Sequence, residues 1–352
     1  MSALDLTTDS VELTRAICDI ESVSGSEREL ADAIQVSLAD AQHLETVRDG
    51  DALIARTNLG RDRRIIIAGH IDTVPVHNNL PCRLDSDELW GRGTVDMKAG
   101  VAVQLKLAAE LLAPRYDITW IWYDHEEVSA ELNGLGRIAR NRPDLLAADF
   151  AILGEPSNGV IEGGCNGTVR VELHTRGLRA HSARAWKGVN AIHQLEPALT
   201  RLAAYQPATI TVDGLDYREG LNAVRVGGGV AGNVIPDAAW LELNYRFAPN
   251  RSAAAAIDEL RALFPEYELV VTDQADGARP GLDAEIAQEF VRAVGAQAQP
   301  KYGWTDVARF SALGIPAVNF GPGDPSLAHA DDERVSVEQI RQSEAALRTW
   351  LS

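Results

Sequence analysis

The 352-residue chain has few of the residues that build disulfide scaffolds, membrane spans or nucleic-acid interfaces. Its three cysteines, Cys18, Cys82 and Cys165, lie far apart and form no C-x-x-C pair, which indicates reduced structural thiols. No apolar run approaches the ~18 residues that a membrane-spanning helix needs. The N-terminus has no basic segment followed by an apolar core, so we expect no secretory signal and a cytoplasmic protein without membrane attachment.

Positive charge is also scarce. The chain carries 33 Lys and Arg against 51 Asp and Glu, a formal net charge of -18. This charge opposes binding to nucleic acid or to an anionic membrane surface, and we expect neither as a partner. An anionic small-molecule substrate would need local arginines or metal ions to attract it against this field. Hydrophobic residues make up 45% and charged residues 24%, as in ordinary globular proteins, and the length favours two domains.

The first part of the chain alternates short apolar strands with helices. Strands are expected in "RRIIIAGH" (63–70), "YDITWIWYDHEE" (116–127) and "ADFAILGEP" (148–156). Helices are expected between them, as in "KAGVAVQLKLAAELLAP" (98–114), and the serines of "SGSERELADAIQVSLADA" (24–41) are candidate helix caps. This alternation predicts an α/β fold in which a mostly parallel sheet has helices on both faces.

The middle of the chain has a different pattern. An alternating strand in "TVRVELHTR" (168–176) precedes an amphipathic helix in "GVNAIHQLEPALTRLAAY" (188–205), two strands, another helix and a last strand. The order β-α-β-β-α-β is that of a ferredoxin-like α+β domain. We therefore predict that residues 1–166 and 276–352 form the α/β domain, and that residues 167–275 are an insert in it.

Five candidate metal ligands all follow predicted strands of the α/β domain or precede its helices. They are His70, Asp96, Glu127, Glu155 and His329. Each has an ordinary structural interpretation, such as helix capping for Asp96 or turn formation for Glu155 before Pro156. However, open α/β sheets bind ligands outside the carboxyl ends of their strands, and all five are predicted at that edge. Their joint placement therefore favours a metal site.

Charge balance favours two divalent ions over one. Three of these ligands are carboxylates, so one bridging hydroxide would neutralise the remaining charge of a metal pair. Histidine and carboxylate donors without thiolate suit Zn²⁺ in a hydrolytic site, with Co²⁺ or Mn²⁺ as substitutes. Asp72 lies two residues past His70, so its carboxylate is expected to fix the tautomer of that imidazole. Glu126, next to Glu127, is the expected general base that takes a proton from the metal-bridging water.

The ordered motifs "GHIDTVP", "GRGTVDMKAG", "DHEEV", "LGEPS" and "RAHSARAWKGVNAI" resemble those of the dinuclear-zinc amidohydrolase and exopeptidase family. That family includes acetylornithine deacetylase, aminoacylase, glutamate carboxypeptidase and succinyl-diaminopimelate desuccinylase. The resemblance spans almost the whole chain. It implies that Asp96 bridges two metals, that His70 and Glu155 complete one site, and that Glu127 and His329 complete the other. The chain departs from the family at His125, where Asp is more frequent.

The resemblance extends to the insert. His181 resembles the family histidine that stabilises the oxyanion of the reaction, often from the partner subunit of a dimer. Asn233 and Arg246 resemble substrate contacts, and Arg184 and Thr305 are further candidates for binding a carboxylate or an amine. The implied substrate is a small anionic N-acyl amino acid, and a homodimer through the insert is expected.

The site by itself leaves the acyl group open, so an acetylated amino acid or a peptide remains an alternative substrate. A non-catalytic metal-binding relative is a further alternative, because a shared fold does not guarantee a shared activity. Such relatives are expected to lack the base or a ligand, and this sequence retains Glu126 and all five candidate ligands.

Overall fold

The computed structural model describes residues 3–295 and 297–352 and divides the chain into two compact units. The first unit comprises residues 1–163, 280–299 and 309–352, and the second comprises residues 164–279 and 300–308. The second unit is thus larger than the predicted insert of residues 167–275. It gains the segment around Lys301 because the N–H of Asn166 donates to the Lys301 carbonyl, and it gains Ala278 because that residue pairs with Cys165.

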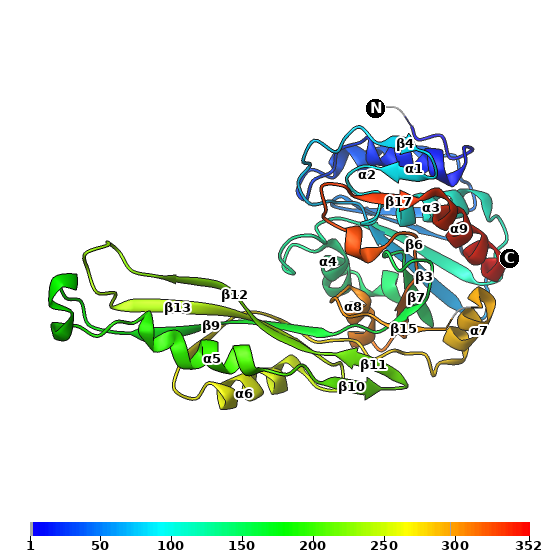
Figure 1. Ribbon diagram of the computed structural model, residues 1–352. Coiled ribbons are helices and arrows are strands. Elements are labelled where there is room, and N and C mark those ends of the chain that lie inside the picture. The colour runs from blue at the N-terminus through cyan, green and yellow to red at the C-terminus, as the bar shows by residue number, and fades with distance from the viewer. Residues whose placement is uncertain (1–2, 296) are drawn as a thin grey trace. The chain divides into compact units, whose positions relative to one another are not determined.

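An eight-stranded mixed sheet forms the centre of the first unit (Figure 1). Its four central strands run parallel in the order β6-β3-β7-β16, whereas β1, β2 and β8 run antiparallel to their neighbours. In spatial order the strands are β1 Glu45–Asp49, β2 Ala52–Arg56, β6 Asp117–Tyr123, β3 Arg64–His70, β7 Phe150–Leu153, β16 Ala317–Asn319, β8 Glu162–Gly163 and β15 Gln299–Pro300. Apart from Arg64 at the start of β3, the residues of the central strands are buried, as is typical of parallel strands covered on both faces.

Helices cover the sheet, and Figure 1 shows α4 on the opposite side from α3 and α9. Ile65 and Ile67 of β3 join a core that is shared with helices α1, α2, α3, α7 and α9, whereas Ile66 and Ala68 are buried on the other face. The helices are α1 Ser10–Cys18, α2 Arg28–Ser37, α3 Lys98–Glu110, α4 Gly134–Asn141, α7 Glu285–Val294, α8 Val307–Ala312 and α9 Val337–Leu351. A small sheet adds β4 Arg83–Asp85, β5 Glu88–Trp90 and β17 Arg334–Ser336. The predicted α/β class is confirmed.

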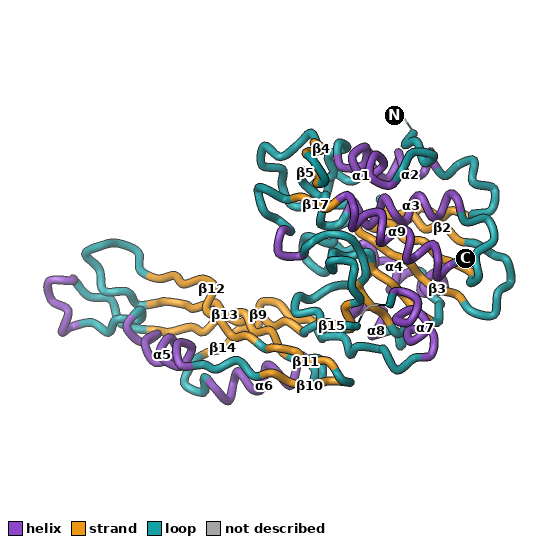
Figure 2. Tube along the Cα trace, turned by 45° about the vertical axis from the view of Figure 1, so that its right-hand side comes forward, coloured by secondary structure: helices purple, strands orange, loops and turns teal. Residues whose placement is uncertain are grey.

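The second unit is built on a four-stranded antiparallel sheet in the order β12-β13-β9-β14, which is the ferredoxin-like arrangement (Figure 2). Its elements are β9 Gly167–Arg176, α5 Glu196–Ala204, β12 Gly220–Gly228, β13 Ala238–Phe247, α6 Ala253–Leu263 and β14 Glu268–Ala275. Alternate residues of β9 and β13 pack against α5 and α6 in a separate core. A hairpin that the sequence did not suggest, β10 Thr209–Val212 and β11 Leu215–Arg218, precedes β12.

Two helix starts differ from the sequence-based expectations. Glu27, and not a serine, occupies the N-cap position of α2, and no side chain caps this helix. The helix expected from residue 188 begins only at Glu196, because the side chain of Asn190 accepts the N–H of Ile192 and forms a turn first. Among the described residues, no helix combines the length and the apolar character that crossing a bilayer requires.

Candidate metal and active site

The ends of the parallel strands bring the candidate residues to one edge of the first unit. His70 is the last residue of β3 and pairs with Tyr123 of β6, so the segment from Asp124 leaves the sheet beside it. Glu155 follows β7, whose Leu153 pairs with Ala68, and is therefore level with His70. It is only 5% exposed. The strand register therefore places His70 and Glu155 at the same edge of the sheet.

Asp96 lies between two imidazoles. Its Oδ1 is 3.0 Å from Nε2 of His70, and its Oδ2 is 3.4 Å from Nε2 of His329. His329 Nε2 also lies 2.8 Å from Oε1 of Glu127. Asp96 does not cap α3, because Met97 occupies the N-cap position and no side chain caps that helix. Each carboxylate oxygen of Asp96 thus faces a different histidine.

The donor set fits divalent cations. One ligand atom each from His70, Asp96 and Glu127 lies within 4.8 Å of the others, and no other group of described residues meets this criterion. Asp96 and Glu127 together raise the pKa of His329 to about 10. Burial by itself would raise the pKa of Asp96, but its hydrogen bonds with His329 and His70 lower it. Carboxylates that stabilise protonated imidazoles so strongly are in position to stabilise metal ions instead.

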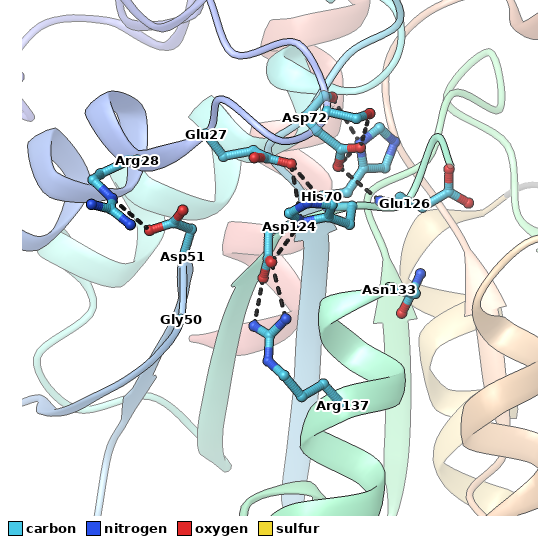
Figure 3. Close-up of polar contacts among 12 residues, drawn as sticks. Glu27, Arg28, Gly50, Asp51, His70, Asp72, Asp124, Glu126, Asn133 and Arg137 are labelled. Atoms are coloured by element: carbon cyan, nitrogen blue, oxygen red, sulfur yellow. Dashed lines mark hydrogen bonds and ion pairs between the residues drawn. The ribbon is translucent and has the colours of Figure 1, made fainter. Parts of the chain in front are cut away.

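Asp72 connects His70 to the segment that carries both glutamates (Figure 3). The main-chain oxygen of Asp72 lies 3.0 Å from Nδ1 of His70, closer than its carboxylate at 3.5 Å. That carboxylate instead accepts the N–H groups of Glu126 and Glu127, both at 3.0 Å, and the hydroxyl of Ser24 at 2.7 Å. Burial opposes its ionisation, yet these bonds and His70 lower the pKa of Asp72 to about 2. The expected carboxylate contact to the imidazole is therefore secondary to the main-chain one.

A buried ion pair supports the Asp96 segment. Arg92 donates to Oε2 of Glu333 at 2.7 Å, and their side chains are 4% and 1% exposed. Oε1 of Glu333 accepts the N–H of Val95 at 3.0 Å and that of Asp96 at 3.2 Å. Arg92 also donates to the carbonyl of Ala330, in the loop that carries His329. This pair joins the segments of two candidate ligands.

The remaining candidates all belong to the second unit. His181 accepts the N–H of Ala183, and the N–H of Ser182 donates to the carbonyl of Asn233, so His181 and Asn233 lie in adjacent segments. Arg184 is exposed nearby, with a non-helical backbone inside a 3₁₀ segment.

Arg246 lies at the other end of the same sheet. It pairs with Thr168 on β9, whereas Ala238 pairs with Arg176 at the end near His181. The eight residue steps from Ala238 to Arg246 span roughly 26 Å at about 3.3 Å per residue. Arg246 is half-buried and donates to the side chain of Asn244. Thr305 is buried in the 300–308 segment, so these candidates do not form one group within the unit.

Comparison with known proteins identifies the family. The model of peptidase family M20/M25/M40 matches residues 66–352. The chain belongs to this family. A putative succinyl-diaminopimelate desuccinylase of Mycobacterium tuberculosis is 54% identical to this M20 protein over 351 residues, 99% of each chain. A succinyl-diaminopimelate desuccinylase of Corynebacterium glutamicum is 48% identical over 360 residues, 99% of this chain and 98% of the relative.

A solved structure has the same fold as this M20 protein. Aminopeptidase PepT from Bacillus cereus has a TM-score of 0.79 at 19% identity and covers 97% of both chains. The match of the family model to residues 66–352 confirms the resemblance inferred from the sequence motifs. Within the family, the segments "DHEEVSAELNGLGRIA" and "TDVARFSALGIPAVNFGPGDPSLAHADDE" resemble the actinobacterial type of succinyl-diaminopimelate desuccinylase. Both relatives are named succinyl-diaminopimelate desuccinylase, the Mycobacterium protein as a putative one.

Three residues of this site were not singled out from the sequence: Glu27, Arg92 and Glu333. Arg92 lies inside the quoted "GRGTVDMKAG" motif, and Glu333 follows His329 by four residues in "HADDE". A charged residue in a segment that also carries a candidate ligand was the available signal for both. Glu27 had no such signal, because it precedes His70 by more than 40 residues in an ordinary helix start.

Proposed function

We propose that this chain is a metal-dependent amide hydrolase that cleaves N-succinyl-LL-2,6-diaminopimelate into succinate and LL-2,6-diaminopimelate, a step of diaminopimelate and lysine biosynthesis. The two relatives support the substrate, because each covers nearly the whole chain at 54% and 48% identity. The arrangement of Asp96, with one carboxylate oxygen toward each imidazole, is the observation that carries the hydrolytic chemistry. The cytoplasmic location of the protein stays a prediction.

The proposed cofactor is a pair of zinc ions, for which cobalt or manganese could substitute. Asp96 would be shared between them, with His70 and Glu155 holding one ion and Glu127 and His329 the other. When bound, the ions supply positive charge that acidifies water and polarises the amide carbonyl.

Glu126 is the proposed general base. It accepts a proton from the attacking water and returns it to the amine nitrogen as the C–N bond breaks, so succinate leaves with the oxygen of water. Asp72 acts on this step through the backbone, because its carboxylate holds the N–H groups of Glu126 and Glu127. The same residue orients His70 through its carbonyl.

The second unit is proposed to bind substrate and to form a homodimer. Arg246 suits a substrate carboxylate through bidentate hydrogen bonds, with Thr305 as a further polar contact. His181 and Asn233 lie beyond the end of the sheet at Ala238, which is roughly 26 Å from Arg246 along β13, too far for one small substrate to contact both ends. We therefore assign His181 and Asn233, with Arg184 beside them, to the active site of the partner subunit, where His181 donates to the oxyanion.

The edge strand β12 is the proposed dimer contact. It is an outermost strand of the sheet β12-β13-β9-β14, and its Val224 and Val226 are 49% and 63% exposed. An exposed apolar edge strand favours pairing with a second copy. We expect Val226→Lys to convert the dimer to a monomer in analytical ultracentrifugation and to lower turnover through loss of the partner's His181. A monomeric wild-type protein with full activity would refute both assignments.

Initial rates on N-succinyl-LL-diaminopimelate and N-acetyl-ornithine test the activity, after chelation and again after zinc is added back. Zinc-restored turnover that strongly favours the succinyl substrate is the expected result. A preference for the acetyl substrate would keep the site and replace the substrate assignment. A zinc-loaded Glu126→Gln variant with full turnover would refute the assignment of Glu126 as general base. A wild-type protein that binds metal but hydrolyses neither of these two substrates nor peptides would indicate a non-catalytic relative.

A further inference from the structure

Three consecutive backbone N–H groups of the 125–127 segment donate to buried carboxylates. Glu27 Oε1 accepts the N–H of His125 at 3.1 Å. The two carboxylate oxygens of Asp72 accept the N–H groups of Glu126 and Glu127. The segment that carries the proposed base and one proposed ligand is thus held by two carboxylates from distant parts of the chain, as Figure 3 shows.

Glu27 is an unusual residue to find at this position. It is fully buried, and its Oε2 accepts no hydrogen bond from the described residues. Burial raises the pKa of Glu27. A buried carboxylate is unfavourable unless it has partners, so its presence calls for a role. Capping α2 is not that role, because Glu27 makes no side-chain cap to the helix that it precedes.

The turn that contains Gly25 positions both Glu27 and Ser24, and Ser24 contacts Asp72. Gly25 has a φ of +91°, a conformation that favours glycine. Ser24, before the turn, donates to the carboxylate of Asp72, and Glu27, after it, accepts from His125. One short N-terminal segment therefore supplies one support of the 125–127 backbone, Glu27, and contacts the other, Asp72.

His125 is held on its other side as well. Its φ of +59° is uncommon for a residue with a side chain, and such a conformation persists only where the surroundings impose it. Its Nδ1 lies 2.8 Å from Oδ2 of Asp124 and 3.3 Å from Oε1 of Glu27. Asp124 in turn receives two hydrogen bonds from Arg137, which is anchored by Asp49.

We infer that Glu27 is a positioning residue for the reaction. By accepting the N–H of His125, it fixes the backbone from which Glu126 reaches the substrate. This inference rests on the proposed role of Glu126 as general base. It assigns a part in catalysis to the N-terminal segment, which lies outside residues 66–352 matched by the family model.

The test compares Glu27→Met with Glu27→Gln. Met keeps the volume and suits the buried position but accepts no N–H, whereas Gln keeps an acceptor oxygen. At saturating zinc we expect Glu27→Met to lower kcat by on the order of tenfold to a hundredfold, with KM nearly unchanged and a melting temperature close to that of wild type. We expect Glu27→Gln to restore kcat to within a few-fold of wild type. Glu29→Ala, an exposed change two residues away, is the matched control and should alter neither.

Hydrogen exchange of the metal-free proteins supplies a readout that does not depend on activity. In wild type, the His125 amide should exchange far more slowly than the amides of the exposed residues 128–130, and Glu27→Met should remove this protection. Fast exchange of His125 in wild type would overturn the inference even if no Glu27 variant folds. So would a folded Glu27→Met enzyme with wild-type kcat. Glu126→Gln in the same assays separates the two inferences. If this variant is inactive, a failure of the Glu27 inference leaves the assignment of Glu126 as general base intact. If this variant is active, the assignment of Glu126 as general base is wrong.

Discussion

Replacing either member of the Arg92–Glu333 pair tests how the Asp96 segment is held. Both side chains are almost fully buried, and their closest atoms are 2.7 Å apart. Glu333→Gln retains an oxygen for the N–H groups of Val95 and Asp96 but leaves the guanidinium of Arg92 without a counter-charge. Removing one partner of a buried pair in this way typically costs about 3–5 kcal/mol of unfolding free energy.

The reciprocal change should cost less. In Arg92→Met the remaining Glu333 can take up a proton, because burial already raises its pKa and a neutral carboxyl still accepts from the two N–H groups. The expected loss is that of charge-assisted hydrogen bonds, about 1.5–3 kcal/mol. Glu333→Gln should therefore be more destabilising than Arg92→Met. Both should weaken zinc binding by about 10–100-fold, as is typical when a residue that supports a metal ligand is lost.

Urea unfolding in the presence of a chelator measures the stability of both variants without a contribution from bound metal, and competition with a zinc-sensitive dye measures the affinity. The matched control is Asp332→Asn. Asp332 lies next to Glu333, but its side chain is 64% exposed and, among the described residues, forms an ion pair only with Arg334. It should change stability by no more than about 0.5 kcal/mol. The reasoning is refuted if Arg92→Met is the more destabilising variant, or if Asp332→Asn matches Glu333→Gln.

Three further outcomes follow from single residues. Asp117 is a buried carboxylate. Burial would raise its pKa, but N–H groups of the 57–61 loop lower it. The ionised carboxylate therefore stabilises the folded protein above the ordinary Asp pKa, and this stabilisation is lost as the pH falls through the lowered pKa. The melting temperature of Asp117→Asn should therefore lie below that of wild type at pH 7, with the gap closing below about pH 4. In Gly100→Ala the new Cβ would lie 2.2 Å from the carbonyl oxygen of Gly154, so calorimetry should show a loss of roughly 1–3 kcal/mol and metal analysis a lower zinc content. Excess zinc should raise the melting temperature of wild type by several degrees but not that of Asp96→Asn; an equal rise in both would contradict the shared role of Asp96.

Local pattern was sufficient for the elements that carry the site. The run of isoleucines before His70 and the apolar segment before Asp124 are short and β-rich, and a long helical segment that ends near Pro114 separates them. A parallel sheet with ligands at its carboxyl edge follows from this order. Weaker elements were missed or misplaced. The β10–β11 hairpin and the late start of α5 depend on packing and on the Asn190 turn, which a local apolar period does not reveal.

By itself the sequence determined the fold class, the family and the candidate ligands, because strand ends and ordered motifs are encoded over short distances. Only the tertiary structure decided which partners hold those ligands. The bond from His125 to Glu27 joins residues 98 positions apart, and that from Asp96 to Glu333 spans 237 positions. It also decided that the Asp72 carboxylate serves the 126–127 backbone, and that His181 and Arg246 lie at opposite ends of one sheet. Such contacts depend on how the chain returns on itself, and no local period encodes them.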